Sequence, residues 1–294
     1  MKRMKGIGLL LFANILIFAT LSISFTILLE FVLPAFGIDL RGSIARQDLL
    51  WAFVIGFGGA FISLAFSKQM ARAMTTCSQI TQPKNQAEMV VVETVQKIAN
   101  YLNIKKPEIW IYDAPDPNAF ATGPSKNNSM VAVSTGLLKN LKEEEVRAVL
   151  AHEMGHVYNG DMFTTTVLAG LMNTFVYFIS TWVARHVAER NFMLYLIVYF
   201  FLQVVLSFLA MIPISAFSRR REFAADRFAA NTVGKDNMIS ALEAINRWVT
   251  QAQFEYSTKD ALATMKISGP SKGFLQLFST HPPIETRVAA LKSL

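Results

Sequence analysis

The chain is poor in cysteine and in charged residues. Cys77 is the only cysteine among 294 residues, so no disulfide can form within the chain, and this scarcity is typical of a reducing compartment. Only 17% of the residues are charged, whereas 52% are hydrophobic. Such a balance is unusual for a soluble protein and is typical of a chain that is partly embedded in a membrane.

The sequence also lacks the pattern of a nucleic-acid-binding protein, although its net charge is +7. Basic residues do not alternate with aromatic ones. They cluster beside apolar runs instead, at residues 2–5, 68–72 and 219–221. Clusters in these places are typical of the cytoplasmic margin of a membrane, so we expect the lipid bilayer as a partner and no nucleic acid.

Four apolar runs are long enough to cross a bilayer, which takes about 20 helical residues. They cover residues 7–29, 49–66, 162–184 and 192–214. No small-residue cleavage pattern follows the first run, which therefore predicts an uncleaved signal anchor. For the last two runs an alternative stays open, namely a buried helical hairpin in a soluble domain.

The distribution of basic residues predicts how these runs are oriented. The basic N-terminus and the basic clusters after the second and fourth runs place the N-terminus and both long polar segments in the cytoplasm. We therefore expect one transmembrane hairpin at residues 1–74 and a second one at 162–214. A cytoplasmic domain would then be assembled from residues 75–161 and 215–294.

Local patterns predict a mainly α protein with a small β-sheet. Apolar residues at helical spacing predict a helix over 91–102, and the stretches EIWIY (108–112) and MVAVS (130–134) predict strands. The segment between these strands is rich in Pro, Gly and Asn, which predicts a loop. Further helices are expected at residues 142–160, 218–232, 236–253 and 284–291.

The stretch AHEMGH (151–156) contains a metal-binding motif. On a helix, His152 and His156 lie on one face about 6 Å apart along the axis, where two imidazoles can bind one tetrahedral cation. Glu153 is one position further round, within reach of a water on that cation, which is the place of the general base in a zinc peptidase. The alternative is an exposed helix face with two ordinary histidines.

The stretch RREFAAD (220–226) offers the further groups that such a site needs. Glu222 and Asp226 share one helix face, so Glu222 is a candidate third ligand and Asp226 a candidate acceptor for the N–H of a ligand histidine. The alternative is a solvated face paired with the neighbouring arginines. His281, in STHPPIETR, is either a donor to the oxyanion of a reaction intermediate or part of the turn that begins the next helix.

The predicted membrane crossings bring these groups together. His156 lies just before the third apolar run and Glu222 just after the fourth, so the chain crosses the bilayer twice between them. Two crossings return the chain to the same cytoplasmic surface, whereas an odd number would separate the two groups by the whole bilayer. The predicted site therefore lies at the membrane margin, and we expect its substrates in or near the bilayer.

Five stretches together resemble the HtpX family of membrane-bound zinc metalloproteases, which is related to the C-a-a-X prenyl endopeptidases. They are NAFATG (118–123), VAVSTGLL (131–138), AHEMGHVYNGDM (151–162), SRRREFAAD (218–226) and THPPIETR (280–287). The resemblance covers essentially the whole chain. With the four apolar runs, it implies four transmembrane helices plus a cytoplasmic gluzincin-like α+β zinc peptidase domain.

The resemblance also implies an activity. This would be ATP-independent hydrolysis of misfolded or damaged membrane proteins at the bacterial inner membrane, often under stress. It implies that one Zn²⁺ per chain is bound by His152, His156 and Glu222. Glu153 would be the catalytic base, and His281 would act on the transition state.

A second resemblance concerns Asn118, Ala119 and Phe120. In thermolysin-like gluzincins, an Asn-Ala-aromatic segment at a sheet edge pairs its backbone with extended substrate. By this resemblance the three residues would line the cleft and add the substrate as a further strand. The alternative is an ordinary loop.

Three rival functions remain open beside the peptidase. The first is a non-proteolytic membrane chaperone or adaptor with a structural metal site, against which the intact Glu153 argues. The second is a divalent-cation transporter, but the candidate ligands lie outside the apolar runs, whereas transport pathways place polar groups at mid-membrane. The third is a soluble peptidase with an unusual apolar hairpin, which membrane extraction would separate from the others.

Overall fold

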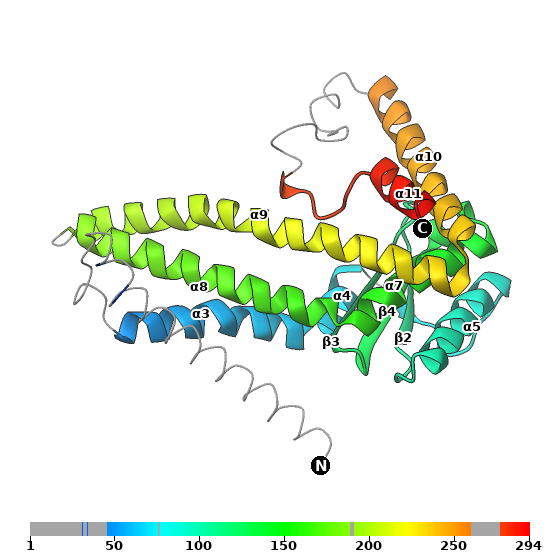
Figure 1. Cartoon of the computed structure of the whole chain (residues 1–294), viewed down its shortest axis with the longest axis horizontal. Coiled ribbons are helices and arrows are strands. Elements are labelled where there is room, and N and C mark those ends of the chain that lie inside the picture. Colours follow the sequence, from blue (N-terminus) through cyan, green and yellow to red (C-terminus); the bar gives the residue numbers. More distant parts are fainter. Residues whose placement is uncertain (1–30, 32–33, 35–45, 76, 189–190, 260–276) are drawn as a thin grey trace, which may run out of the picture. The chain divides into compact units, whose positions relative to one another are not determined.

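The fold is mainly helical and contains one small mixed β-sheet (Figure 1). The computed structural model describes residues 31, 34, 46–75, 77–188, 191–259 and 277–294. The predicted apolar run at 7–29 lies outside these residues. The chain divides into two compact units, one of Met1–Gly59 with Ala169–Ala210 and one of Ala60–Leu168 with Met211–Leu294.

Three described helices are long and apolar enough to cross a membrane. They are α3 (Arg46–Ala65), α8 (Asp161–Val187) and α9 (Phe192–Val233). The predicted runs at 49–66, 162–184 and 192–214 lie almost wholly within them. In the first unit α3 and α8 approach closely at Gly56, where an added Cβ would lie 2.4 Å from Oγ1 of Thr174. Bulk at Gly56 would therefore separate the two helices.

The first part of α9 has the surface of a lipid-facing helix. None of the residues in its most apolar 18-residue stretch is buried. Phe192, Phe201 and Val204 are 71%, 65% and 71% exposed. Large apolar side chains exposed in this number mark a surface that contacts lipid or another apolar partner. This exposure argues against a hairpin buried in a soluble domain.

The prediction that residues 218–232 are helical is confirmed, but they form the last part of α9, which continues without a break from Phe192 to Val233. Pro213 lies inside this helix and removes one backbone donor, but it does not end it. The residues that follow include Ala, Arg, Glu and Phe, and the first three are strong helix formers. One continuous helix therefore carries the chain from the membrane run to Glu222.

The sheet of the second unit has the strand order β1-β2-β4-β3. Strands β2 (Glu108–Tyr112) and β4 (Asn128–Ser134) are parallel and confirm the two predicted strands. Two-residue β1 (Ser78–Gln79) pairs antiparallel with β2, and β3 (Ala119–Ser125) pairs antiparallel with β4.

The loop predicted between β2 and β4 is therefore wrong in part, because β3 lies within it. Its composition misled the prediction, since Gly123 and Pro124 are residues of turns. A proline is tolerated in an edge strand, where its missing N–H breaks no ladder, and β3 is at the edge of the sheet. Gly123 has a φ of 144° and lies where the β3–β4 register shifts.

Helices cover both faces of the sheet. On one face α5 (Gln86–Tyr101), α7 (Glu143–Asn159) and α10 (Lys235–Lys259) form the main core, with α6 (Thr135–Asn140) and α11 (Ile284–Lys292) at its margin. On the other face Tyr112, Met130 and Ala132 are covered by a smaller cluster that includes Ala71 of α4 (Ser67–Thr75).

Candidate metal centre

Helix α7 carries the two histidines of the motif. It begins with three acidic residues, which suit the positive end of the helix dipole, and the backbone N–H of Lys142 donates to Glu145 at 2.9 Å. The helix ends at Gly160, whose φ of 69° is left-handed and turns the chain directly into α8. One long face is buried in the core, so His152 and His156 are held at fixed positions along it.

The second half of α9 lies against this part of α7. The close approach depends on Gly155, between the two histidines. A Cβ at this position would lie 3.1 Å from Cδ1 of Phe228 and 3.3 Å from Cα of Ala225, both on α9. The missing side chain therefore lets α9 come near enough to bring Glu222 opposite His152 and His156.

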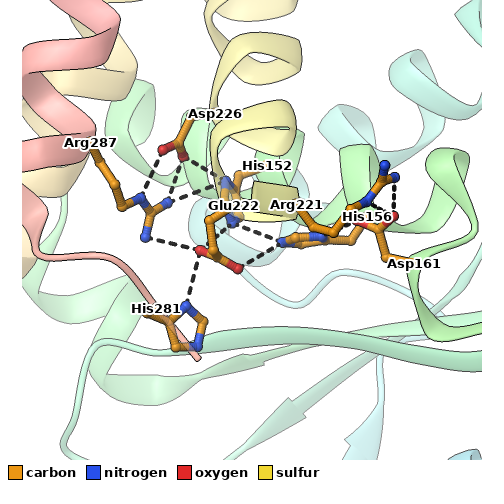
Figure 2. A network of polar contacts seen from close by, with 8 residues as sticks. All are labelled: His152, His156, Asp161, Arg221, Glu222, Asp226, His281 and Arg287. Atoms are coloured by element: carbon orange, nitrogen blue, oxygen red, sulfur yellow. Dashed lines mark hydrogen bonds and ion pairs between the residues drawn. The ribbon is translucent and has the colours of Figure 1, made fainter. Parts of the chain in front are cut away.

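Three side chains converge in a geometry that fits a metal ion (Figure 2). The Nε2 atoms of His152 and His156 are 3.1 Å apart. Oε1 of Glu222 lies 3.3 Å from Nε2 of His156, and its Oε2 lies 3.6 Å from Nε2 of His152. A tetrahedral ion with bonds of about 2.0–2.1 Å separates its ligand atoms by roughly 3.3 Å. Two imidazoles and one carboxylate thus have the donor set and the spacing of a zinc site.

The outward nitrogen of His152 faces a buried ion pair. Its Nδ1 is 2.9 Å from Oδ1 of Asp226, the contact expected from the sequence. Arg287 of α11 binds the same carboxylate through two nitrogens, with Nε at 2.7 Å and Nη2 at 2.5 Å. Nη1 of Arg287 also lies 3.1 Å from Oε2 of Glu222. Asp226 and Arg287 are 1% and 8% exposed.

The outward nitrogen of His156 also faces an ion pair, which was not predicted from the sequence. Its Nδ1 is 2.7 Å from Oδ2 of Asp161, the first residue of α8. Nε of Arg221, from α9, donates to the other oxygen of Asp161 at 2.5 Å. The signal was present, because Asp161 follows the glycine that ends the motif helix, and Arg221 directly precedes Glu222. Arg287 was missed as well, although it ends the stretch THPPIETR.

These contacts raise the pKa of both imidazoles in the metal-free protein. Burial lowers the pKa of His156, but its hydrogen bonds to Asp161 and Glu222 outweigh burial and raise it to about 10. For His152, burial lowers the pKa, and the hydrogen bonds to Asp226 and Glu222 again raise it above the ordinary value. A metal must therefore displace protons from these rings.

Glu153 follows His152 on α7, the helix that contacts strand β3 of the sheet. Burial raises the pKa of its carboxyl, while the charges of His152 and His156 lower it to a smaller extent. The carboxylate also accepts a hydrogen bond from the backbone of Ala121 in β3, against which α7 packs. A raised pKa suits a group that takes up and returns a proton near neutral pH.

The segment with Asn118, Ala119 and Phe120 forms the start of the edge strand. The backbone N–H of Asn118 donates to Oγ of Ser134 at 3.0 Å, and its carbonyl accepts from the Ser134 N–H at 2.9 Å. Ala119 and Phe120 then pair with β4. Within the described part of the chain, no strand pairs with the outer edge of β3. Its free backbone groups lie on the strand that contacts Glu153.

His281 reaches the same centre from the segment before α11. Its Nδ1 lies 3.0 Å from Oε2 of Glu222, and its side chain is 67% exposed (Figure 2). The structure thus brings His281 to the open side of the candidate ligands. His186, at the end of α8, is not at the centre, and its Nδ1 lies 2.8 Å from the carbonyl of Trp182.

Comparisons with known proteins find relatives of this chain. A family model described as peptidase family M48 matches residues 84–294. The protease HtpX of Alkalilimnicola ehrlichii is 42% identical over 308 residues, covering 98% of this chain and 98% of that protein. The protease HtpX of Pasteurella multocida is 42% identical over 286 residues, covering 96% and 98%.

A solved structure shares the fold. The crystal structure of Ste24p from S. mikatae has a TM-score of 0.62 and 16% sequence identity. The match covers 97% of this chain and 66% of that one. At this identity the likeness concerns the fold alone, and it includes the membrane-capable helices together with the small sheet.

Proposed function

Because the chain belongs to peptidase family M48 and is a metallopeptidase, we propose that it is an integral-membrane zinc endopeptidase that hydrolyses misfolded or damaged membrane proteins. One observation carries the proposal: His152, His156 and Glu222 converge beside the acidic side chain of Glu153. Three membrane-capable helices and the HtpX relatives support a membrane protein with polypeptide substrates.

His152, His156 and Glu222 would hold the ion. A zinc ion bound there would supply a Lewis acid that polarises water and the peptide carbonyl. The charges around it support a divalent cation. Arg287 and Arg221 neutralise Asp226 and Asp161, so the negative charges of Glu222 and Glu153 remain to balance a dication.

Asp226 and Asp161 would fix the two imidazoles. Each aspartate accepts the N–H of the outward Nδ1 and leaves Nε2 free to bind the metal. This selects one tautomer of each ring and holds the plane of the ring. The sequence predicts this role for Asp226. We propose the same role for Asp161, because it contacts His156 in the way that Asp226 contacts His152.

Glu153 would move the proton of the reaction. As general base it takes the proton from the attacking water, and it later gives this proton to the departing amine. His281 would donate a hydrogen bond to the oxyanion, since its ring lies on the exposed side of Glu222. Both groups sit beside the ligands without belonging to them.

The substrate would bind as an extended strand along β3. Asn118, Ala119 and Phe120 belong to the edge segment, and the backbone of β3 is anchored on its inner side by β4. A strand added at the free edge gains main-chain hydrogen bonds that do not depend on side chains. Such binding suits an enzyme that must accept many unfolded sequences.

We further propose four spans, with the N-terminus and the peptidase domain in the cytoplasm at the bacterial inner membrane. The basic cluster at Arg219, Arg220 and Arg221, just after the apolar part of α9, supports this orientation. The scarcity of cysteine is in keeping with a reducing compartment.

The test compares Glu153→Gln with the parent protein in detergent. Bound zinc and hydrolysis of unfolded casein are measured for both, and Glu144→Gln, an exposed glutamate earlier on α7, is the matched control. We expect about one zinc in all three proteins and cleavage by all but Glu153→Gln, which should lose at least about 10³-fold in rate. If the parent protein holds zinc but does not cleave, the chaperone or adaptor function replaces this one.

A further inference from the structure

Helix α4 (Ser67–Thr75) follows the membrane-capable helix α3 without a loop. Backbone hydrogen bonds continue across the junction, from Phe66 N to Ile62 O at 3.0 Å and from Met70 N to Phe66 O at 2.9 Å. The last turn of α3, from Ala60 onward, belongs to the same compact unit as α4 and the sheet. The position of α4 is therefore fixed relative to both the end of the span and the sheet.

The polar face of α4 is turned toward the protein. Nζ of Lys68 lies 2.7 Å from Oε1 of Glu108, at the start of β2, and Arg72 forms an ion pair with the other oxygen of that carboxylate. The guanidinium of Arg72 also lies over the ring of Trp110, 4.6 Å from its centre. These groups anchor α4 to the face of the sheet that Ala71 covers.

The apolar face of α4 is turned outward. Phe66, Met70 and Met74 are spaced by four residues, so they form one stripe, and they are 54%, 49% and 81% exposed. None of the residues of α4 is buried. A surface helix of a soluble domain has the opposite arrangement, with its apolar stripe on the core and its charges in water.

We propose that this stripe, Phe66, Met70 and Met74, lies in the interfacial layer of the bilayer and holds the sheet at the membrane surface. The continuity with α3 identifies the occupant. The candidate span Asp48–Ala65 has 18 residues. At 1.5 Å per residue it is about 27 Å long, which falls short of a hydrocarbon core of about 30 Å. The first turn of α4 is thereby drawn to the lipid boundary.

The charges of α4 favour the same partner. Lys68 and Arg72 point to Glu108 and Trp110, away from the stripe, so lipid contact at Met70 leaves both cations paired with the protein. Methionine and phenylalanine side chains gain free energy when they leave water for the acyl boundary. No charged side chain has to enter the lipid with them.

The consequence concerns the edge strand. Helix α4 also contacts β3, so a membrane-bound α4 holds β3 and its free edge close to the headgroups. Polypeptide segments that leave the bilayer would reach this edge before they reach bulk water. This consequence rests on the proposed function, whereas the contact of α4 with lipid does not.

The test places a nitroxide spin label on α4 of the full chain in lipid vesicles, on a Cys77→Ser background that removes the only native thiol. Met70→Cys and Met74→Cys are labelled, and collision rates are measured with a lipid-soluble and a water-soluble relaxing agent. Ile62→Cys, 63% exposed within α3, is the lipid control, and Tyr101→Cys, 77% exposed at the end of α5, is the water control.

We expect the ratio of lipid-soluble to water-soluble collisions at Met70 to be severalfold higher than at Tyr101 and close to that at Ile62. The ratio at Met74 should be equal to that at Met70 or slightly lower. A ratio like that of Tyr101 at both positions would overturn the proposal. Magnetic coupling between labels on two chains would also overturn it, because a second copy would then cover the stripe. So would protection of the labels from the water-soluble agent only when unfolded casein is added, because the substrate would then cover the stripe.

A matched pair of charge variants adds a functional readout. Met70→Glu places a carboxylate on the stripe, and Gln69→Glu adds the same charge one residue away, on an exposed polar position. Cleavage of a membrane-inserted substrate should fall severalfold for Met70→Glu, with cleavage of a soluble peptide and all rates of Gln69→Glu unchanged. Equal losses of Met70→Glu on both substrates would contradict the proposal. Absence of cleavage by the parent protein would instead contradict the proposed function, and the spin-label measurement would still test the contact of α4 with lipid.

Discussion

Each of the two candidate ligand histidines is held by an aspartate–arginine pair, which we call its support, but the two supports differ in their surroundings. Each presents its Nδ1 to an aspartate, and each aspartate is held by an arginine. On the His152 side the arginine side chain, Arg287, is 9% exposed. On the His156 side the arginine, Arg221, is 28% exposed.

This difference separates what the two supports depend on. The His152 support is closed by α11, near the end of the chain, so it forms only when distant parts of the sequence have packed together. The His156 support is formed where α7, α8 and α9 meet, and Asp161 is the first residue of a membrane-capable helix. We therefore expect the pair of Asp226 and Arg287 to matter more for stability, and the pair of Asp161 with the partly exposed Arg221 to matter mainly for the metal.

The largest expected effect is that of Asp226→Asn. Loss of the carboxylate leaves Arg287 buried without its bidentate partner, which costs about 3–5 kcal/mol of folding free energy. Loss of a partner of a ligand histidine lowers metal affinity about 10–100-fold. Thermal unfolding of the metal-free protein and zinc competition with a chelator measure the two losses.

Asp236→Asn, at an exposed aspartate in the first turn of α10, is the control for this substitution. It should change neither measurement by more than a small amount. A metal-free Asp226→Asn protein as stable as the parent would show that Arg287 is satisfied by Glu222 alone.

Asp161→Asn should have the second-largest effect, and mainly on the metal. We expect zinc affinity to fall about tenfold, since His156 loses the acceptor that fixes its ring. The loss of folding free energy should be only about 1 kcal/mol, because Arg221 is partly exposed and water can solvate it. If Asp161→Asn destabilises the metal-free protein as much as Asp226→Asn does, the contrast between the two supports fails.

The sequence was sufficient to find the three side chains that converge at the candidate metal centre, but not the whole network of contacts around them. His152, His156, Glu222 and Asp226 follow from spacing on two helices, because residues four apart share a face. Asp161 comes after the end of α7, so no periodicity links it to His156, and only the left-handed turn at Gly160 brings the two together. Arg287 is 135 residues from His152, and its contact depends on the packing of α11.

The fold could be predicted where one pattern dominated. Composition alone reveals β2 and β4 as short, mainly apolar runs, and it reveals the membrane-capable helices as long ones. Strand β3 was missed because its Gly and Pro have the composition of a loop, and its strand conformation comes from pairing with β4. The sequence did not predict that α9 is unbroken, because its apolar first part and its polar second part have different patterns.

Gly155→Ala should perturb both supports slightly and equally. An added Cβ lies 3.1 Å from Phe228 and 3.3 Å from Ala225, so α9 must move by a few tenths of an ångström and carry Glu222 with it. A displacement of 1 Å in such a site can cost about 10²-fold, so we expect a loss of about threefold in zinc affinity and in rate. Gly58→Ala, whose Cβ would meet open space, is the matched control and should leave both unchanged.

The smallest expected effect is in the number of protons released when zinc binds. At pH 8 His156 of the metal-free protein is protonated, because its pKa is raised to about 10, so zinc must displace about one proton from this ring. The affinity for zinc should therefore rise with pH up to about 10 and fall as the solution becomes more acidic.

Asp161→Asn removes a cause of the raised pKa of His156, so at pH 8 this variant should release fewer protons than the parent. Calorimetry in buffers of different ionisation enthalpy counts these protons, and an equal number for both proteins would show that Glu222 alone keeps His156 protonated.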